Sequence, residues 1–317
     1  MRKLLSNLYR LITGMRNCLY DAGMLPVRRA DVPVVSIGNI EVGGTGKTPF
    51  TIALARELSA RGYRPVIVTR GYKGRLKGIV HVRPDHDFRD VGDEALFMAR
   101  TSGVPVVKSP DRFRGAMYAR SGLKADLVLL DDGFQHRRCH RDLDIVLVSG
   151  DVSREALLPS GRLRESADSL RRADIIVYTK GSGGGGVTAE LIPSSLLDGP
   201  GGTRDLSLLR GKRVLAVSGI ARPDHFIRSL HELGARTEAL TFRDHYAYTS
   251  RDIEKIKARA KDCDLIVTTE KDMVRMKPAW LDAKWLALKV EMCVTGMEGI
   301  IREIDDIAKG SGVPRQG

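Results

Sequence analysis

Short apolar runs alternate with amphipathic stretches along most of this chain. Six apolar runs in the first part are predicted to be strands: Val32–Ile37, Pro65–Thr69, Pro105–Lys108, Leu127–Leu130, Asp144–Val148 and Asp174–Thr179. Stretches such as Pro49–Ala60 and Asp93–Thr101 lie between them and have helical spacing. Strands that are apolar throughout and separated by helices are typical of a parallel sheet covered on both faces. We therefore predict a doubly wound α/β domain here.

A second strand–helix series follows a segment rich in glycine, proline and serine. That segment starts with Gly181-Ser-Gly-Gly-Gly-Gly186 and runs to about Thr203, and its composition predicts a flexible connection. The strands predicted beyond it are Arg213–Ser218, Thr237–Phe242, Leu265–Thr269 and Trp285–Val290. The pattern predicts an N-terminal helix, a first α/β domain, a connection and a second, smaller α/β domain, over residues 1–25, 26–180, 181–205 and 206–317.

The first twenty residues form an amphipathic pattern of their own. Seven apolar side chains fall within an arc of roughly 120° on a helix: Leu4, Leu5, Leu8, Leu11, Ile12, Met15 and Leu19. Up to residue 30, six basic residues accompany one acidic residue. The pattern alone leaves two interpretations open, a helix that lies on anionic lipid and a helix packed on the protein's own core. No run of 18 apolar residues is present, so no membrane-spanning helix is expected.

Composition narrows the class of protein. The 317 residues suffice for roughly two domains. An apolar fraction of 42% and a charged fraction of 29% are ordinary for a globular protein and exclude a wholly disordered chain. The formal net charge of +13 favours an anionic partner. Aromatic residues make up only 5% of the chain, which is few for a protein that stacks on nucleic-acid bases. Four scattered cysteines without a C-x-x-C pair indicate a reducing compartment.

A glycine-rich loop after the first predicted strand is the strongest motif. We predict that it binds ATP through residues Glu41, Val42, Gly43, Gly44, Thr45, Gly46, Lys47 and Thr48. Glycines allow backbone N–H groups to face phosphate oxygens, the lysine neutralises the β- and γ-phosphates, and the threonine hydroxyl ligates Mg²⁺. Glu41 stands where the strict P-loop pattern has its first glycine. The compact form is that of the partitioning ATPases, whose signature lysine is replaced here by Val42.

A pair of acids supplies the carboxylates that a nucleotide-bound Mg²⁺ needs. Asp131 and Asp132 end the apolar run that starts at Leu127. The carboxyl ends of parallel strands are where ligands gather in doubly wound sheets. We therefore predict that Thr48, Asp131 and Asp132 hold the metal.

A set of further motifs is shared with one family, and several of them are specific to it rather than general P-loop features. The shared motifs are Gly38-Asn39 and Val42–Pro49, Arg70-Gly71-Tyr72, Gly92-Asp93-Glu94, Asp111-Arg112, Asp131–His136, Arg141-Asp142, Leu163-Arg164-Glu165, Asp244-His245 and Thr269-Glu270-Lys271-Asp272. In these motifs, over nearly its whole length, the chain resembles the tetraacyldisaccharide 4′-kinases of lipid A synthesis. The N-terminal helix also resembles the family's membrane-associating element, which favours the interfacial interpretation.

The resemblance implies a reaction and roles for individual residues. The reaction is transfer of the γ-phosphoryl group of ATP to the 4′-hydroxyl of a lipid disaccharide 1-phosphate, at the cytoplasmic face of the bacterial inner membrane. The family's proposed base falls on Asp93 and its histidine partner on His245, while Lys47 keeps its role at the phosphates. Supporting positions in the active site fall on Arg70, Arg112, Gln135, His136, Arg164 and Glu165.

Three positions depart from the family pattern. Lys73 stands where glycine is usual, Arg162 where proline is usual and Cys139 where leucine is usual. We expect Lys73 and Arg162 to affect loop shape and contacts with anionic substrate, and to leave the chemistry in place.

Two other functions compete with the kinase. A membrane-surface ATPase switch related to the partitioning ATPases is disfavoured by Val42 and by the second domain with Asp244-His245. A nucleic-acid-dependent NTPase is suggested only by charge, and the scarcity of aromatic residues argues against it.

Overall fold

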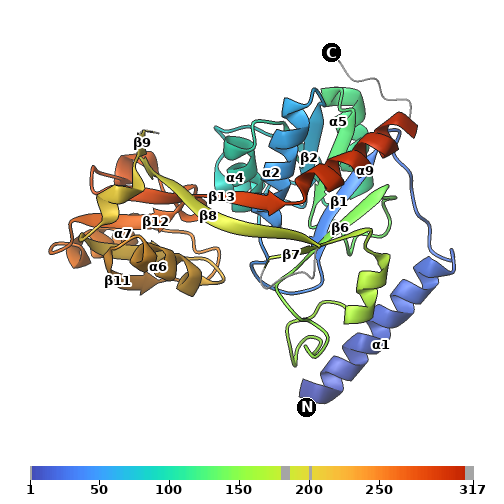
Figure 1. Ribbon diagram of the computed structural model, residues 1–317, viewed down its shortest axis with the longest axis horizontal. Helices are drawn as coiled ribbons and strands as arrows, with labels where there is room; N and C mark the ends of the chain where they lie inside the picture. Colours follow the sequence, from blue (N-terminus) through green and yellow to red (C-terminus); the bar gives the residue numbers. More distant parts are fainter. Residues whose placement is uncertain (1, 180–185, 200–201, 311–317) are drawn as a thin grey trace. The chain divides into compact units, whose positions relative to one another are not determined.

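The computed structural model describes residues 2–179, 186–199 and 202–310, and the chain divides into two compact units (Figure 1). Unit 1 comprises Met1–Glu190 and Met292–Gly317, and unit 2 comprises Leu191–Glu291. Two long strands, β8 (Val187–Asp198) and β13 (Trp285–Thr295), each contain a boundary between the units.

This division differs from the predicted one. In the predicted connection over 181–205, residues 181–185 and 200–201 lie outside the described residues. The strand β8 begins at Val187 and pairs antiparallel with β9 (Thr203–Arg204). The C-terminal part of the predicted second domain, from Met292 onward, belongs to unit 1 instead. The helix α9 (Met297–Gly310) buries an isoleucine face there, and the Tyr63 hydroxyl donates to Asp305 at 2.6 Å.

Unit 1 is built on a parallel sheet with strand order β7-β6-β1-β5-β2-β4-β3. Its strands are β1 (Val34–Asn39), β2 (Pro65–Thr69), β3 (Val80–Val82), β4 (Val106–Lys108), β5 (Leu127–Asp131), β6 (Leu143–Val148) and β7 (Ile175–Tyr178). The edge strand β3 alone among them runs antiparallel to its neighbour. The chain moves outward from β1 to β4, returns to β5 beside β1, and then continues to β6 on the other side. In open α/β sheets, ligands bind outside the carboxyl ends of the strands where the order reverses, which here are β1 and β5.

Helices cover both faces of this sheet. Its helices are α2 (Lys47–Ala60), α3 (Phe88–Val91), α4 (Asp93–Thr101), α5 (Arg112–Leu123) and the 3₁₀ helix η1 (Ala167–Arg172). On one face, Ala116 and Ala119 of α5 pack in a cluster with Val68 and Val128. Side chains alternate along a strand, so the opposite face of β2 and β5 remains for α2, which buries Phe50 and its other apolar residues. The predicted P-loop-like, doubly wound α/β fold is confirmed.

Unit 2 is a smaller α/β layer structure. Its parallel strands have the order β11-β10-β12-β13, with β10 (Arg213–Ser218), β11 (Arg236–Thr241) and β12 (Leu265–Thr269). Its helices are α6 (Pro223–Glu232), α7 (Ser250–Arg259), α8 (Glu270–Met273) and the 3₁₀ helices η2 (Leu206–Leu209) and η3 (Pro278–Trp280). One cluster of buried side chains includes Leu230 of α6 and another includes Ile256 of α7, so both faces of the sheet are covered.

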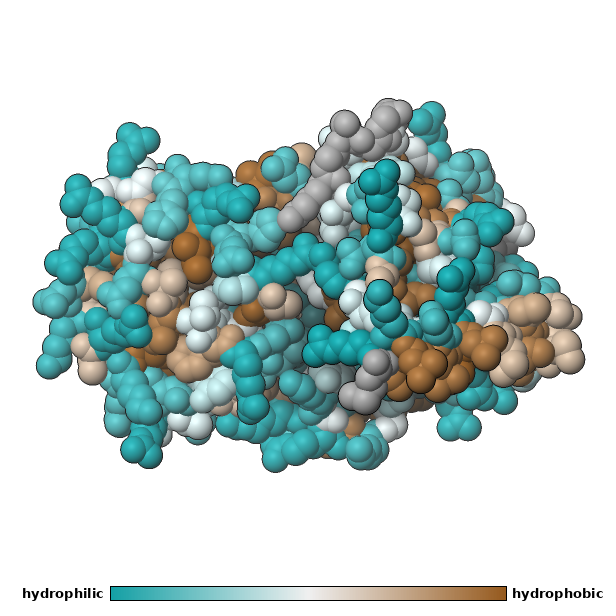
Figure 2. All heavy atoms as spheres, turned by 90° about the horizontal axis from the view of Figure 1, so that it is seen from below, coloured by the Kyte–Doolittle hydropathy of each residue, from teal (hydrophilic) through white to brown (hydrophobic). Residues whose placement is uncertain are grey.

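The N-terminal helix α1 (Arg2–Asp21) has no buried residue. Six apolar side chains of its outer face are 47% to 74% exposed, namely Leu4, Leu5, Leu8, Leu11, Ile12 and Met15. Seen from below, they form an apolar patch along α1 (Figure 2). The alternative in which this face packs on the protein's own core is therefore wrong. Among the described residues, no helix is long and apolar enough to cross a membrane.

Candidate active site

The glycine-rich loop joins β1 to α2, as the sequence predicts. Gly43 and Gly46 have φ angles of 108° and 85°, which side chains with a Cβ rarely adopt. The Asn39 amide donates to the Thr45 hydroxyl at 2.8 Å and ties the end of β1 to the loop. Because α2 begins at Lys47, the loop lies at a helix N-terminus, where backbone N–H groups attract phosphate.

Glu41 anchors the start of this loop. Its buried carboxylate accepts hydrogen bonds from the Ser149 N–H at 2.7 Å and from the Arg162 guanidinium at 2.9 Å. Backbone pairing adds to this, because the Val42 N–H donates to the Arg162 carbonyl at 2.8 Å. Arg162, which departs from the family pattern, is thus engaged with Glu41.

Lys47, Asp132 and Arg164 form a charged cluster beside the loop. Lys47 Nζ lies 3.4 Å from Asp132 Oδ1, and Arg164 Nη1 donates to both oxygens of Asp132 at 3.0 Å. Burial raises the pKa of Asp132, but Lys47 and Arg164 outweigh this effect and hold the pKa below its usual value. The Asp132 side chain is 37% exposed, so it is both ionised and within reach of a ligand.

Asp131 lies beneath this cluster at the end of β5. It is buried and accepts hydrogen bonds from the hydroxyls of Thr51 and Thr69, each at 3.3 Å. Together with Thr48 at the start of α2, the two aspartates offer only oxygen donors, which Mg²⁺ prefers. In the part of the chain that the structure describes, no three His, Cys, Asp or Glu side chains form a metal-binding group. Two carboxylates still suit Mg²⁺, because this ion usually keeps waters and phosphate oxygens among its ligands.

Arg112 and His136 support the carboxyl end of β5. The buried Arg112 donates to the Asp131 carbonyl at 3.4 Å, and its backbone N–H donates to His136 Nε2 at 3.4 Å. Burial and the Arg112 charge lower the pKa of His136 to about 4, so its ring is neutral and acts as an acceptor. Gln135 donates to the Asn39 carbonyl at 2.8 Å and so links this loop to β1. The exposed Arg70, at the end of β2, adds positive charge close to Arg112.

Asp93 and His245, the predicted base and its partner, lie in different units. Asp93 is the first residue of α4, is 9% exposed, and accepts from the Glu94 N–H at 3.0 Å. A Cβ on Gly92 would lie 2.6 Å from the Tyr72 carbonyl oxygen, so this glycine lets α4 begin against the Arg70-Gly71-Tyr72 loop. In unit 2, His245 has a φ of 57°, and its N–H donates to the Gly219 carbonyl at 3.2 Å.

Glu165 occupies an unexpected place. Its carboxylate is buried and accepts from the Asn17 amide of α1 at 2.6 Å and from the guanidinium groups of Arg16 and Arg172. It therefore faces α1, while its neighbour Arg164 faces Asp132.

Lys108 has a supporting role that the sequence analysis missed. Its Nζ is buried and donates to the carbonyls of Leu76 at 2.7 Å and Asp90 at 3.0 Å. Its methylene groups cover Gly71, where a Cβ would approach to 2.4 Å. Burial lowers the pKa of Lys108. Lys108 thus holds the loop that precedes Asp93. In the sequence, the feature that could have indicated this role is a charged residue at the end of the predicted apolar strand Pro105–Lys108.

Comparisons with known proteins identify the family to which this chain is similar. The family model described as tetraacyldisaccharide-1-P 4′-kinase matches residues 2–309. A curated tetraacyldisaccharide 4′-kinase from Bdellovibrio bacteriovorus is 36% identical, covering 95% of this chain and 96% of the relative. One from Anaeromyxobacter dehalogenans is 40% identical, covering 89% and 82%. The crystal structure of LpxK from Aquifex aeolicus in complex with ATP is similar, with a TM-score of 0.80, 32% identity, and coverage of 96% and 97%.

Proposed function

The chain belongs to the tetraacyldisaccharide 4′-kinase family, and we propose that it uses ATP and Mg²⁺ to phosphorylate the 4′-hydroxyl of a tetraacyldisaccharide 1-phosphate. The observation that carries this proposal is the cluster of Lys47, Asp132 and Arg164 beside a glycine-rich loop at a helix N-terminus. Phosphoryl transfer requires positioning and neutralisation of charge more than covalent chemistry, and this cluster supplies both.

The proposed roles follow from charge and placement. Lys47 and the loop N–H groups bind the β- and γ-phosphates, and the oxygens of Thr48, Asp131 and Asp132 hold Mg²⁺, which neutralises phosphate charge when bound. When ATP enters, Lys47 and Arg164 exchange part of their pairing with Asp132 for phosphate oxygens.

The acceptor hydroxyl needs a group that takes its proton. We propose Asp93 for this role, with His245 as its partner. Carboxylates are weak bases in general, so the contribution of Asp93 rests on position and on passing the proton onward. The backbone N–H of Glu94 holds one oxygen of Asp93 at 3.0 Å and thereby orients the other.

The activity is tested directly by incubating the purified protein with ATP, Mg²⁺ and tetraacyldisaccharide 1-phosphate in detergent. We expect a bis-phosphorylated product by mass spectrometry, and none when Mg²⁺ is chelated. ATP hydrolysis that proceeds equally well without the lipid would instead support the ATPase switch.

The pairing of Asp93 and His245 is tested by a double-mutant cycle. Asp93→Ala and His245→Ala should each lower kcat strongly and change the KM for ATP little. If the two groups act as a unit, the double variant is only slightly worse than the more damaged single variant. Fully multiplicative losses would mean independent roles, and a wild-type kcat for Asp93→Ala would eliminate it as the base.

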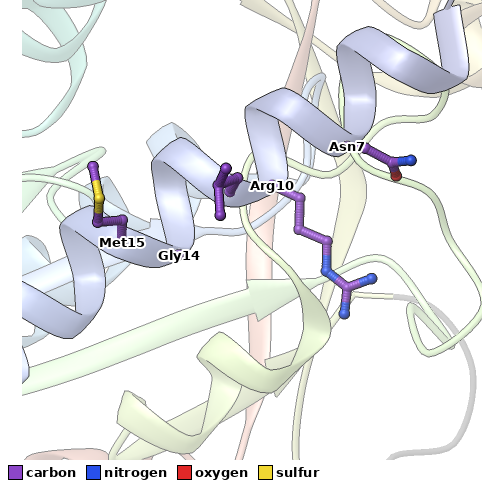
Figure 3. A pocket seen from close by; sticks show the side chains of 5 residues that line it. Asn7, Arg10, Gly14 and Met15 are labelled. Carbon is purple, nitrogen blue, oxygen red and sulfur yellow. The ribbon is translucent and has the colours of Figure 1, made fainter.

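The protein's place in the cell follows from α1. We propose that it binds peripherally to the anionic cytoplasmic surface of the inner membrane, with the apolar face of α1 in the interfacial layer. Exposed leucines beside Arg2, Lys3 and Arg10 suit such a surface. A shallow, open hollow of about 400 Å³ is lined by residues of α1 itself, namely Asn7, Arg10, Leu11, Gly14 and Met15 (Figure 3).

Two charges on the apolar face test the membrane proposal. Leu8→Asp combined with Ile12→Asp should release the protein from vesicles of phosphatidylethanolamine and phosphatidylglycerol. Activity on a short-chain, water-soluble acceptor should survive. A double variant that still sediments with these vesicles at high salt would show that α1 is not the anchor.

A further inference from the structure

We propose that α1, besides meeting the membrane, is a positioning element of the phosphate site, and that Tyr9 and Asn17 act through the segment Leu157–Glu165. This inference rests on the proposed kinase function. All the contacts that carry it lie within unit 1.

Four side chains of α1 contact this segment, namely Ser6, Tyr9, Asn17 and Arg16, the last through the Glu165 carboxylate. The Ser6 hydroxyl donates to the Leu157 carbonyl at 2.8 Å, and the Tyr9 hydroxyl donates to the Arg164 carbonyl at 2.9 Å. Farther along the helix, the Asn17 amide donates to the Glu165 carboxylate at 2.6 Å. The contacts are polar and directional, whereas the outer face of the same helix is apolar and exposed.

The same segment contacts the phosphate loop on its other side. The Arg164 N–H donates to the Ile40 carbonyl at 2.7 Å, and Arg162 binds Glu41 through its guanidinium. The Arg164 side chain then reaches both oxygens of Asp132. Two adjacent residues, Arg164 and Glu165, therefore join α1 to the cluster of Lys47, Asp132 and Arg164 itself.

A second route leads from α1 to the acid pair. Glu165 also accepts a hydrogen bond from Arg172, whose guanidinium carbon lies 4.3 Å from the centre of the Phe134 ring. Phe134 belongs to the loop that begins with Asp131 and Asp132, and it packs against Gly38, where a Cβ would approach Phe134 Cβ to 2.4 Å. A buried carboxylate requires such partners, because an unpaired one would be costly to desolvate.

The two faces of α1 should therefore separate experimentally. The polar-face variant, Tyr9→Phe with Asn17→Ala, removes the hydrogen bonds of Tyr9 to Arg164 and of Asn17 to Glu165 and leaves the Arg16–Glu165 contact in place. We expect it to bind the phosphatidylethanolamine–phosphatidylglycerol vesicles like the wild type, while its kcat on the water-soluble acceptor falls roughly 10- to 100-fold, because small misplacements of charged groups slow phosphoryl transfer. The apolar-face variant, Leu8→Asp with Ile12→Asp, should show the opposite pattern.

A matched control and a folding control accompany this test. Thr13→Val removes a hydroxyl that, within the described part of the chain, bonds only to carbonyls of Tyr9 and Arg10 in the same helix, so it should retain wild-type kcat. Stoichiometric binding of a non-hydrolysable ATP analogue shows that each variant retains a folded site.

A double-mutant cycle distinguishes positioning from general damage. In an Arg164→Ala background, Tyr9→Phe should have little additional effect, because the side chain that Tyr9 positions is gone, whereas Asn17→Ala can still act through Glu165 and Arg172. Full additivity of Tyr9→Phe with Arg164→Ala, or an unchanged kcat in the polar-face variant, would overturn the inference. Absence of product with the wild-type protein would instead refute the kinase function itself, so the two failures are distinguishable.

Discussion

Two carboxylate–arginine pairs, one in each unit, show how similar chemistry serves different ends. In unit 1, Asp132 follows β5 and is bound by Arg164 and Lys47. In unit 2, Asp272 lies shortly after β12 and is bound by Arg275 at 2.6 Å. Both carboxylates thus lie near the carboxyl end of a central parallel strand, and both belong to motifs shared with the family.

The pairs differ in hydration and in the number of fixed partners. Asp272 is fully buried and also accepts from the Gly219 N–H at 2.9 Å and from the Tyr248 hydroxyl at 2.8 Å. Burial raises the pKa of Asp272 even against the lowering effect of Arg275, whereas the pKa of Asp132 is lowered by its cationic partners. The Asp272–Arg275 pair is shielded from solvent, and its hydrogen-bond partners all belong to unit 2, so we assign it a structural role. The Asp132 pair is partly open and can exchange partners with a ligand.

The largest effect is expected from a substitution in the partly exposed cluster of Lys47, Asp132 and Arg164. Lys47→Ala removes the charge that we propose neutralises the transferring phosphoryl group, so kcat should fall about 10³-fold or more. The helix α2 should remain folded, and thermal unfolding should change little. Near-normal kinase activity in this variant would refute the assignment of the loop.

A matched pair of substitutions tests the comparison itself. Asp132→Asn should lower kcat about 100-fold and change the free energy of unfolding by no more than about 1 kcal/mol, since its pair is partly hydrated. Asp272→Asn should cost about 3 kcal/mol, because the buried Arg275 loses its countercharge.

Fluorescence can follow this stability difference during urea unfolding. Both tryptophans of the chain, Trp280 and Trp285, lie in unit 2 and report its unfolding. If Asp272→Asn left the unfolding midpoint unchanged while it abolished activity, the structural role of this pair would be wrong.

Acidification should weaken unit 1 through His136. Its pKa is lowered from 6.5 to about 4 in the folded protein, so the unfolded chain takes up a proton first as the pH falls. Stability is therefore lost between about pH 6.5 and about pH 4, by about 2 kcal/mol after discounting for partial exposure. The raised pKa of Asp272 has the opposite sign, because protonation on acidification favours the folded state.

Urea unfolding at a series of pH values, followed by circular dichroism, measures this dependence. His136→Gln should flatten it across that pH window. A variant that loses stability with falling pH as steeply as the wild type would exclude His136 as the source.

The smallest effect is expected at Lys73, in the loop that follows Arg70-Gly71-Tyr72 in unit 1. Lys73 has a φ of 60°, a backbone conformation that favours the glycine which the resemblance leads us to expect at this position. Lys73→Gly should raise the free energy of unfolding by about 0.5 kcal/mol, the relief of strain being offset in part by the freer unfolded chain. Scanning calorimetry should show a small rise in Tm, and a fall would contradict the strain argument.

Much of unit 1 was predictable because its signals are local. The apolar runs and their helical neighbours gave strand and helix bounds such as Pro65–Thr69 and Asp93–Thr101, which agree with the structure. The glycine-rich loop between a strand and a helix is also a local pattern, and it located Lys47 and Thr48 without any tertiary information. The amphipathic pattern of residues 1–20 identified the helix, but not which surroundings its apolar face would meet.

Long-range contacts decided what the sequence left open. The return of α9 to unit 1 depends on pairing across more than two hundred residues, such as that of Tyr63 with Asp305. No periodicity distinguishes Arg164, which faces Asp132, from Glu165, which faces α1, because adjacent side chains take their directions from the backbone that the whole fold imposes. The sequence by itself determined which chemical groups are present and which local elements carry them. Only the tertiary structure decided which carboxylate stays open to a ligand and which is closed, because burial and partner geometry arise when distant segments pack together.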